Sequence, residues 1–321
     1  MHARAEPSGC IGPVQRRDTG RSGPACLWRC AGRCRPRRGP YARIRFARAD
    51  ISADGPRGRP VRGLLHGNAA RRIHRPVTNA DDHRALVAGA RRILCDIDGC
   101  LIRGGQTIDG AAAFVDAVRD RLALVSNNST DTATGLSDRL ARIGIEVPAT
   151  QIFLAGEQTL LHVQTAYPDA RIRLIATDAM RDRAETLGLH LTSERPDLIV
   201  LCRAPDTTLA ELESVLVQIT QGVPIVAANP DLTHPGAAGP AIETGAVAGL
   251  LRACRPGLAI PFIGKPAAPL FLRGLRNASP DEAIMVGDNP ETDINGAEQL
   301  GIPTLLIHPD KSMGPTIRSL I

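Results

Sequence analysis

Short apolar runs that alternate with helical patterns constrain the fold of this 321-residue chain most strongly. Buried parallel strands read as short apolar runs, and parallel neighbours need a crossover connection between them, usually a helix. The pattern predicts strands at residues 92–95, 122–125, 171–176, 197–202, 224–228 and 283–286, and helices at 111–121, 134–143, 180–187 and 209–220. This order predicts an α/β protein with a Rossmann-like, doubly wound parallel sheet.

Two carboxylates follow the first predicted strand. Asp96 and Asp98 stand two residues apart, so their side chains point the same way at the end of that strand. Like charges held so close repel, and ligands of open α/β sheets bind beyond the carboxyl ends of the strands. We therefore expect the pair to face a cation or to perform chemistry. A surface turn is the plain alternative for an isolated Asp-x-Asp.

Three further polar clusters follow in order along the chain. They are Ser126-Asn127-Asn128 after the second predicted strand, Lys265, and Asp288 with Asp293 after the strand at 283–286. Lys265 is one of two lysines in a chain that otherwise uses arginine for its positive charge. A lysine is a compact point charge that fits beside a phosphoryl oxygen or a carboxylate. A surface loop with a chance lysine is the alternative for that residue alone.

The basic character of the chain belongs to its first 76 residues. This segment holds 18 arginines against four acidic residues, a net charge of +14, whereas the remainder has a net charge of −8. It is rich in Arg, Gly and Pro and has no sustained period, so we expect a disordered extension. The cysteines of this segment lack the paired spacing of a structural zinc site. The segment also lacks the apolar helix face that a transit peptide has. A start of translation near Val77 is a further interpretation.

Several classes of partner are disfavoured by composition. No apolar run reaches the roughly 18 residues of a membrane span. The basic segment holds few aromatic residues on which nucleic-acid bases could stack, so a nucleic-acid partner is not expected. The other four cysteines, Cys95, Cys100, Cys202 and Cys254, are scattered and are expected to be small core residues in a reducing compartment, the cytoplasm.

The four clusters together resemble a known family. Asp-x-Asp-Gly-x-Leu at 96–101, Ser-Asn-Asn-Ser at 126–129, Gly-Lys-Pro at 264–266 and Gly-Asp-x-x-x-Thr-Asp at 287–293 are similar to the four motifs of the haloacid dehalogenase superfamily. The likeness covers about residues 90–321 and is greatest to the NagD-like, p-nitrophenylphosphatase-type subfamily, subfamily IIA. It implies a core in two parts, 77–150 and 256–321, with a large α/β cap inserted at 151–255.

The resemblance also implies an activity: Mg²⁺-dependent hydrolysis of a small phosphate monoester, of sugar or nucleotide monophosphate type, through an aspartyl-phosphate. The carboxylates suit a cation that prefers oxygen ligands, and a carboxylate is able to form such a covalent intermediate. By the family pattern, Asp96 would be the nucleophile and a metal ligand, Asp98 the acid/base and a metal ligand, and Asp288 a further metal ligand. Lys265 would be a catalytic and substrate-binding charge, and Asp293 would support Lys265 or a metal-bound water. The remaining substrate-binding residues would be Ser126, Asn127 and Asn128.

Two departures from the family pattern limit this expectation. Cys100 stands where Thr or Val is usual, and the stretch 238–243 replaces a Pro-Gly-rich segment that usually lies near the substrate. No relative's substrate is therefore carried over. A phosphotransferase or mutase on the same core, and a non-catalytic binding protein with a basic tail, remain open, as does association of copies through the cap.

Overall fold

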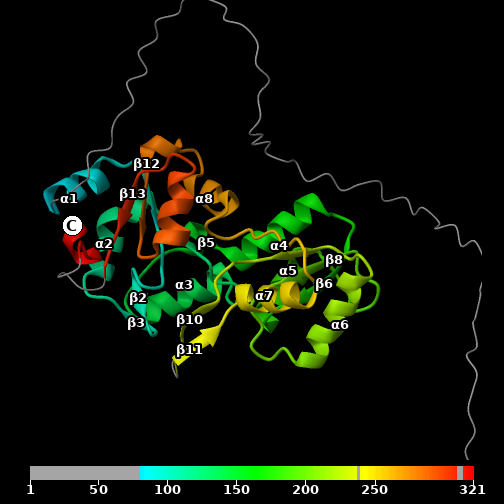
Figure 1. Ribbon diagram of the computed structural model, residues 1–321. Helices are drawn as coiled ribbons and strands as arrows, with labels where there is room; N and C mark the ends of the chain where they lie inside the picture. The colour runs from blue at the N-terminus through cyan, green and yellow to red at the C-terminus, as the bar shows by residue number, and fades with distance from the viewer. Residues whose placement is uncertain (1–79, 237–238, 309–313) are drawn as a thin grey trace, which may run out of the picture. The chain divides into compact units, whose positions relative to one another are not determined.

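The computed structural model describes residues 80–236, 239–308 and 314–321, and the elements along them are labelled in Figure 1. Residues 1–76, for which the sequence predicts disorder, lie outside the described residues, and so do the cysteines of that segment. In the described part of the chain, no helix has both the length and the apolar character needed to span a membrane.

The first sheet has five parallel strands in the order β13-β12-β1-β4-β5. The strands are β1 (Arg92–Cys95), β4 (Leu122–Ser126), β5 (Ile152–Leu154), β12 (Ala283–Gly287) and β13 (Thr304–Leu306). In the centre of the sheet, Leu94 of β1 lies opposite Met285 on one side and Ala123 on the other. Strands distant in sequence thus end side by side around β1.

Alternating side chains divide the core of this sheet into two layers. Ile93 of β1 packs in the cluster that contains Phe114, whereas Leu94 points to the opposite face and packs in the cluster with Phe271. The first layer contains α1 (Ala80–Gly89), α2 (Ala111–Val118) and α3 (Ala133–Arg142), and the second contains α4 (Ala155–Ala166), α8 (Ala268–Leu275) and α9 (Asn295–Glu298). Helices on both faces make this a doubly wound sheet, as the sequence predicts.

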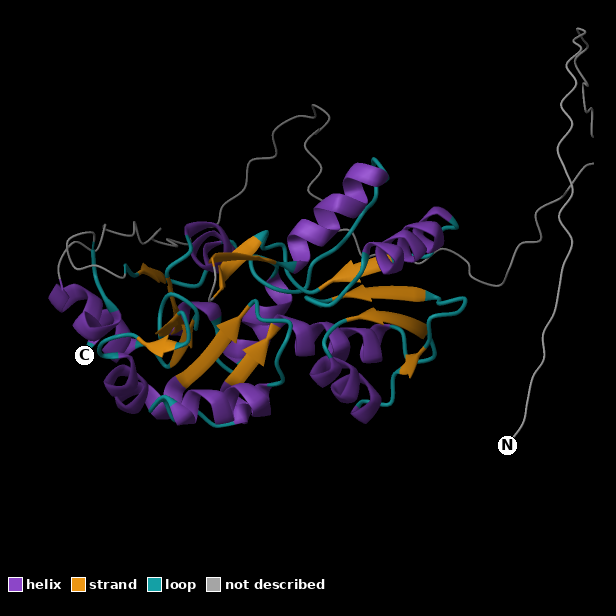
Figure 2. Ribbon diagram, turned by 90° about the horizontal axis from the view of Figure 1, so that it is seen from below, coloured by secondary structure: helices purple, strands orange, loops and turns teal. Residues whose placement is uncertain are grey.

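A second parallel sheet is inserted between β5 and α8, in the order β7-β6-β8-β9. Its strands are β6 (Arg171–Ile175), β7 (His190–Leu191), β8 (Leu198–Leu201) and β9 (Ile225–Ala227), and its helices are α5 (Asp178–Thr186), α6 (Leu209–Thr220) and α7 (Thr244–Cys254). Helices lie on both sides of these strands (Figure 2). This is the inserted α/β cap of the expected fold. β5, at residues 152–154, pairs with β4 and so belongs to the first sheet.

Two hairpins and several short helical turns make up the remaining elements of the described residues. The antiparallel hairpins are β2 (Ile102–Arg103) with β3 (Gln106–Thr107), and β10 (Thr233–Gly236) with β11 (Gly239–Ile242). The 3₁₀ turns are η1 (Arg119–Arg121), η2 (Ala149–Gln151), η3 (Pro280–Glu282) and η5 (Ile317–Leu320), and η4 (Pro290–Ile294) is a π-helical turn.

Several helices and strands begin and end at or near the residues predicted from the sequence, whereas other elements of the structure were not predicted. α6 matches its predicted range, while the helix predicted over 111–121 ends at Val118 and continues as a 3₁₀ turn. α4 was not expected because Glu157, Gln158 and Thr159 interrupt any apolar period, although all three are buried. The expectation that all four scattered cysteines lie in the core is wrong for Cys254, which is exposed at the end of α7.

Candidate active site

The four sequence clusters meet beyond the carboxyl ends of β1, β4 and β12. One cavity of about 1120 Å³ is lined by residues of all four, namely Asp96, Asp98, Ser126, Asn127, Asn128, Lys265 and Asp288. Asp293, the remaining predicted site residue, is fully buried beside it and contacts Lys265. Because parallel strands end at one edge of the sheet, their following loops come together there.

Asp96 and Asp98 have different surroundings although they stand two residues apart. The backbone N–H of Asp96 donates to Val286 O at 2.9 Å, so Asp96 extends β1 alongside β12 and is 8% exposed. Asp98 opens into the cavity. Between them, Ile97 is buried, and its carbonyl accepts from the N–H groups of Leu101 and Ile102, which closes the turn.

Gly99 is required in this turn by a close approach as well as by its backbone conformation. Its φ is +87°, and a Cβ built there would lie 1.9 Å from Asp288 Oδ2. The turn after β1 therefore wraps around the Asp288 carboxylate, which follows β12. No residue with a side chain permits this approach.

Lys265 bridges two buried carboxylates. Its Nζ lies 2.7 Å from Asp96 Oδ1 and 2.6 Å from Asp293 Oδ1, and the side chain is 2% exposed. Burial lowers the pKa of Lys265, but the charges of Asp293 and Asp96 outweigh this effect, so that its pKa is raised. Burial raises the pKa of Asp96, and the Lys265 ammonium opposes that rise. A charged lysine between two acids is the arrangement that these contacts favour.

The other two acids also have shifted pKa values. The cavity walls around Asp98 raise its pKa by desolvation, while Arg139 and Lys265 lower it in part. Burial raises the pKa of Asp288 to about 6, with a further rise from Asp293 and an opposing effect of Lys265. Both acids therefore titrate closer to neutral pH than an exposed aspartate does.

The loop after β4 contributes polar groups at the same edge. Ser126, the last residue of β4, is buried and lines the cavity, and Asn127 Nδ2 donates to Lys265 O at 3.0 Å. Asn128 Oδ1 accepts from the N–H groups of Thr130 and Asp131 at 2.9 and 3.0 Å. The side chain of Asn128 thus shapes the loop, and Asn127 fixes the backbone that carries the lysine.

The acids can hold a divalent cation. One ligand atom each from Asp96, Asp288 and Cys100 lies within 4.8 Å of the other two. Carboxylate oxygens suit Mg²⁺, which keeps several water ligands. The Cys100 thiol is buried, and burial together with neighbouring Cys95 and the acids raises its pKa, which keeps the sulfur protonated beside the carboxylates. The charged donors in this set are therefore oxygens, in agreement with the expected metal.

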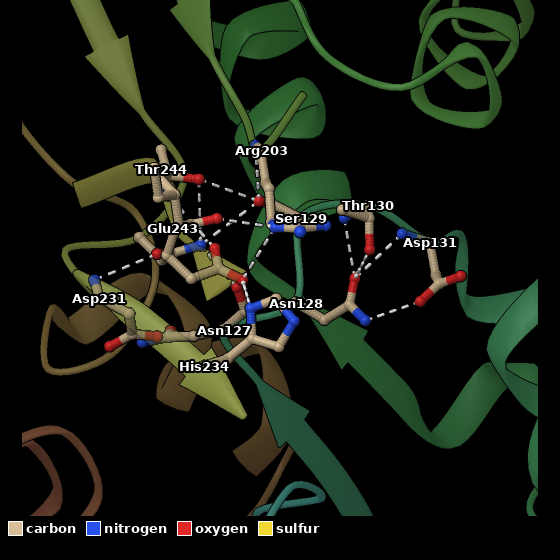
Figure 3. Close-up of polar contacts among 12 residues, drawn as sticks. Asn127, Asn128, Ser129, Thr130, Asp131, Arg203, Asp231, His234, Glu243 and Thr244 are labelled. Atoms are coloured by element: carbon tan, nitrogen blue, oxygen red, sulfur yellow. Dashed lines mark hydrogen bonds and ion pairs between the residues drawn. The ribbon is translucent and has the colours of Figure 1, made fainter. Parts of the chain in front are cut away.

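The inserted segment supplies a further wall of the cavity that the sequence did not assign to the site. Its polar residues there are Arg203, Asp231, Thr233, His234 and Glu243. Several of them gather around the loop at 127–131 (Figure 3). Glu243 lies in the stretch 238–243, which corresponds to a segment that usually lies near the substrate in the family, whereas no signal marked Arg203 or His234.

Comparisons with known proteins agree with this arrangement. A family model described as haloacid dehalogenase-like hydrolase matches residues 93–190, and one described as HAD-hydrolase-like matches residues 262–319. The chain is 30% identical over 222 residues to the 5′-nucleotidase YutF of Bacillus subtilis, a match that covers 67% of this chain and 86% of that protein. It is 27% identical over 224 residues to the ribonucleotide monophosphatase NagD of Escherichia coli, covering 68% and 87% of the two chains.

A solved structure shares the fold. The glycerol phosphate phosphatase of Mycobacterium tuberculosis in complex with magnesium aligns with a TM-score of 0.66 at 26% identity, over 73% of this chain and 77% of that one. The sheet order, the four clusters at one sheet edge and these matches have one explanation: the chain belongs to the haloacid dehalogenase-like hydrolases, in their NagD-like subfamily, and is an enzyme of the phosphatase type.

Proposed function

We propose that this enzyme hydrolyses a small phosphate monoester, of sugar phosphate or nucleotide monophosphate type, with Mg²⁺ and through an aspartyl-phosphate. The observation that carries this proposal is the contact of 2.7 Å between Lys265 Nζ and Asp96 Oδ1 at the end of β1, with Asp288 alongside. A carboxylate attacks an anionic phosphate only where positive charge offsets the repulsion and geometry is enforced. The activities of two relatives, a 5′-nucleotidase and a ribonucleotide monophosphatase, support this class of reaction.

In the first step, an oxygen of Asp96 attacks the phosphorus and the bond from phosphorus to the ester oxygen breaks. Asp98 donates its proton to the leaving alkoxide, a role that its raised pKa assists. Lys265 and the hydroxyl of Ser126 offset the charge of the phosphoryl oxygens. Asp96, Asp288 and the backbone carbonyl of Asp98 would hold Mg²⁺, which would supply further positive charge at this site.

In the second step, water attacks the phosphorus of the aspartyl-phosphate. Asp98, now a carboxylate, takes the proton from that water, and the bond from phosphorus to Asp96 breaks. Phosphate leaves and Asp98 is again protonated for the next cycle. Asp293 holds Lys265 in place through the contact of 2.6 Å and does not touch the reacting atoms in this scheme.

We further propose that residues 77–150 and 256–321 form the catalytic core and that the segment from 151 to 255 acts as a cap, of which β5 and α4 pack with the first sheet. Polar residues of this segment line the cavity, so a bulky or macromolecular ester meets its wall. A compact phosphorylated metabolite is the partner that such a cavity admits.

The free thiols of Cys95, Cys100 and Cys202 suit a reducing compartment, and we place the enzyme in the cytoplasm.

The test is turnover of p-nitrophenyl phosphate by the full chain with Mg²⁺, with a chelator, and after Asp96→Asn. We expect phosphate release that depends on the metal and is lost in the variant. Asp138→Asn, an exposed aspartate on α3, is the matched control and should retain activity. Activity of Asp96→Asn equal to that of the control would contradict an aspartyl-phosphate mechanism.

A further inference from the structure

We infer that Asn229 is a positioning residue of the proposed reaction: its side chain fixes the loop after β4 and, through that loop, the backbone of Lys265. The inference rests on the proposed phosphatase function and adds to it a residue that supports the reacting groups from outside the cavity. Asn229 comes two residues after β9, is fully buried and is not among the described residues that line the cavity. It therefore acts through other residues rather than on the substrate.

The carboxamide of Asn229 is fully hydrogen-bonded. Its Nδ2 donates to the backbone carbonyl of Asn127 at 2.7 Å, and to the hydroxyl groups of Ser129 at 3.3 Å and Thr244 at 3.4 Å. Its Oδ1 accepts from the N–H of Asp231 at 3.1 Å, which fixes the end of the amide that carries the oxygen. A buried amide with all its partners present has one orientation, and the shortest of its bonds holds Asn127.

The contact with Asn127 continues to the lysine of the site. The side chain of Asn127 in turn donates from Nδ2 to Lys265 O at 3.0 Å. Two amides in series thus join the end of β9 to the loop after β4, and that loop to the backbone of Lys265. The Lys265 ammonium lies between Asp96 and Asp293, so a shift of the lysine backbone moves the charge that faces Asp96.

A close backbone approach joins the same three segments. The carbonyl of Ala228, next to Asn229, accepts from the N–H of Gly264 at 2.7 Å, directly before Lys265. A Cβ built on Gly264 would lie 2.5 Å from Asn127 Oδ1 and 2.7 Å from Ala228 O. Because the segments are packed so closely, the end of β9 and the loop after β4 together set where the lysine enters the site.

The anchored loop carries groups that face the phosphoryl oxygens in the proposed reaction. Ser126 precedes the anchored residue Asn127 and Asn128 follows it, and all three line the cavity. Donors and charges stabilise a transition state only where they are held in the productive geometry, and a displacement of about 1 Å can cost roughly 10²-fold in rate. Loss of the Asn229 amide should therefore lower kcat more than it weakens substrate binding.

The first experiment measures turnover of p-nitrophenyl phosphate by the full chain at saturating Mg²⁺ after Asn229→Ala. We expect kcat to fall by roughly tenfold or more and KM to change by less than about threefold. Gln164→Ala is the matched control, because it also removes an amide that donates to a backbone carbonyl at 2.7 Å, that of Leu187, within the inserted segment. The control should keep kcat. Equal kcat in the two variants overturns the inference, whereas turnover by the unmodified chain leaves the phosphatase function intact.

A double variant tests the route through the loop. Asn127→Ala removes the hydrogen bond to Lys265 O, so it should lower kcat by itself. If Asn229 acts through Asn127, adding Asn229→Ala should lower kcat by less than about threefold further. Two losses that multiply in the double variant would show independent effects and overturn the inference.

Hydrogen exchange followed by mass spectrometry tests the positioning without turnover. We expect Asn229→Ala to speed amide exchange in segments 126–131 and 262–266 and to leave α2 at the rate of the unmodified chain. Asn229→Ser, whose hydroxyl is too short to reach the Asn127 carbonyl, replaces the alanine variant where that variant does not fold. Absence of turnover of any phosphate ester by the unmodified chain overturns the function, and the exchange rates then decide the inference. Unchanged exchange in both segments overturns it.

Discussion

At the scale of single residues, two aspartates of one motif acquire different chemistry from their surroundings. Asp96 is buried and held by Lys265 through a contact of 2.7 Å, whereas Asp98 opens into the cavity, and desolvation raises the pKa of both acids. An attacking group must be held in place, and an acid/base must exchange protons with the leaving group and water. The local environments of the two residues therefore support the roles proposed for them.

Asp98→Asn should therefore slow both steps without preventing attack. The amide neither donates nor accepts the proton, so we expect kcat to fall by roughly 10²- to 10⁴-fold. Rapid-quench measurement with a ³²P-labelled ester should still detect slow labelling of the protein, and Asp96→Asn should show none. Full labelling at the wild-type rate in Asp98→Asn would contradict the role of Asp98 as the acid of the first step.

The metal requirement should change with pH because of Asp288. The pKa of this acid is raised to about 6 without a metal, and a cation binds its deprotonated form. Below pH 6 protons compete with Mg²⁺, so the concentration of Mg²⁺ for half-maximal activity should rise as the pH falls from 7.5 to 5.5. Titrations with Mg²⁺ at several pH values measure this. A constant Mg²⁺ requirement over that range would contradict ligation by Asp288.

Lys265 should matter for stability as well as for activity. Lys265→Met leaves Asp96 and Asp293 buried without their cation, and we expect a loss of about 3–5 kcal/mol in the free energy of unfolding, as for other broken buried ion pairs. Adding Asp293→Asn removes one of the two orphaned charges and should recover part of that loss. Urea denaturation of the single and double variants measures their free energies of unfolding. Additive changes from the two substitutions would show that Lys265 and Asp293 do not interact energetically.

At the scale of elements, the turn after β1 is the most constrained piece of the site. Gly99→Ala places a methyl group against the Asp288 carboxylate, whereas Gly104→Ala, also at a positive φ, meets nothing within 4 Å. Both substitutions carry backbone strain, so the difference between them reports the clash. We expect Gly99→Ala to lower Mg²⁺ affinity, measured by calorimetry, well beyond any effect of Gly104→Ala. Equal affinities would show that the turn tolerates a side chain.

At the scale of the whole described molecule, a buried polar junction joins the two sheets. Ser129 Oγ lies 3.1 Å from Thr244 Oγ1, and it accepts from the N–H of Arg203 at 3.0 Å and from Asn229 Nδ2 at 3.3 Å. Ser129 follows β4, whereas the other three residues belong to the inserted segment. The buried Ser129 hydroxyl thus provides a hydrogen-bond partner for polar groups of the inserted segment, two of which, on Asn229 and Thr244, are themselves buried.

Ser129→Ala should weaken this junction. It leaves the backbone N–H of Arg203 without its acceptor and removes one acceptor of Asn229 Nδ2, which keeps Asn127 O and Thr244 Oγ1. We expect a loss of about 1–3 kcal/mol in the free energy of unfolding. Thr186→Ala, which removes a hydroxyl that bonds to its own exposed helix, is the control and should cost less. Thermal denaturation of the two variants measures the difference. Equal shifts in melting temperature would show that the junction contributes nothing beyond an ordinary hydroxyl.

The sequence pattern predicts the fold and the sheet edge that carries the candidate active site, but it does not predict every helix. Apolar runs predict β1, β4 and β12, and α6 is predicted to its ends, because their residues are patterned by burial alone. α4 escapes prediction because its buried face carries Glu157, and Ala133 N donates to that carboxylate at 3.1 Å. Such a partner lies far along the chain, and no period within the helix reveals it.

The sequence by itself predicted that the polar clusters after β1, β4 and β12 gather at one edge of a parallel sheet, because parallel strands share a direction and end at the same edge, and the family resemblance added Lys265 to them. Only the tertiary structure decided how those clusters interact. It buried Lys265 between Asp96 and Asp293, wrapped Gly99 around Asp288, and placed His234 and Glu243 over the cavity. Lys265 stands 169 residues from Asp96 and 28 from Asp293, and the distances between such segments are set by packing rather than by local pattern.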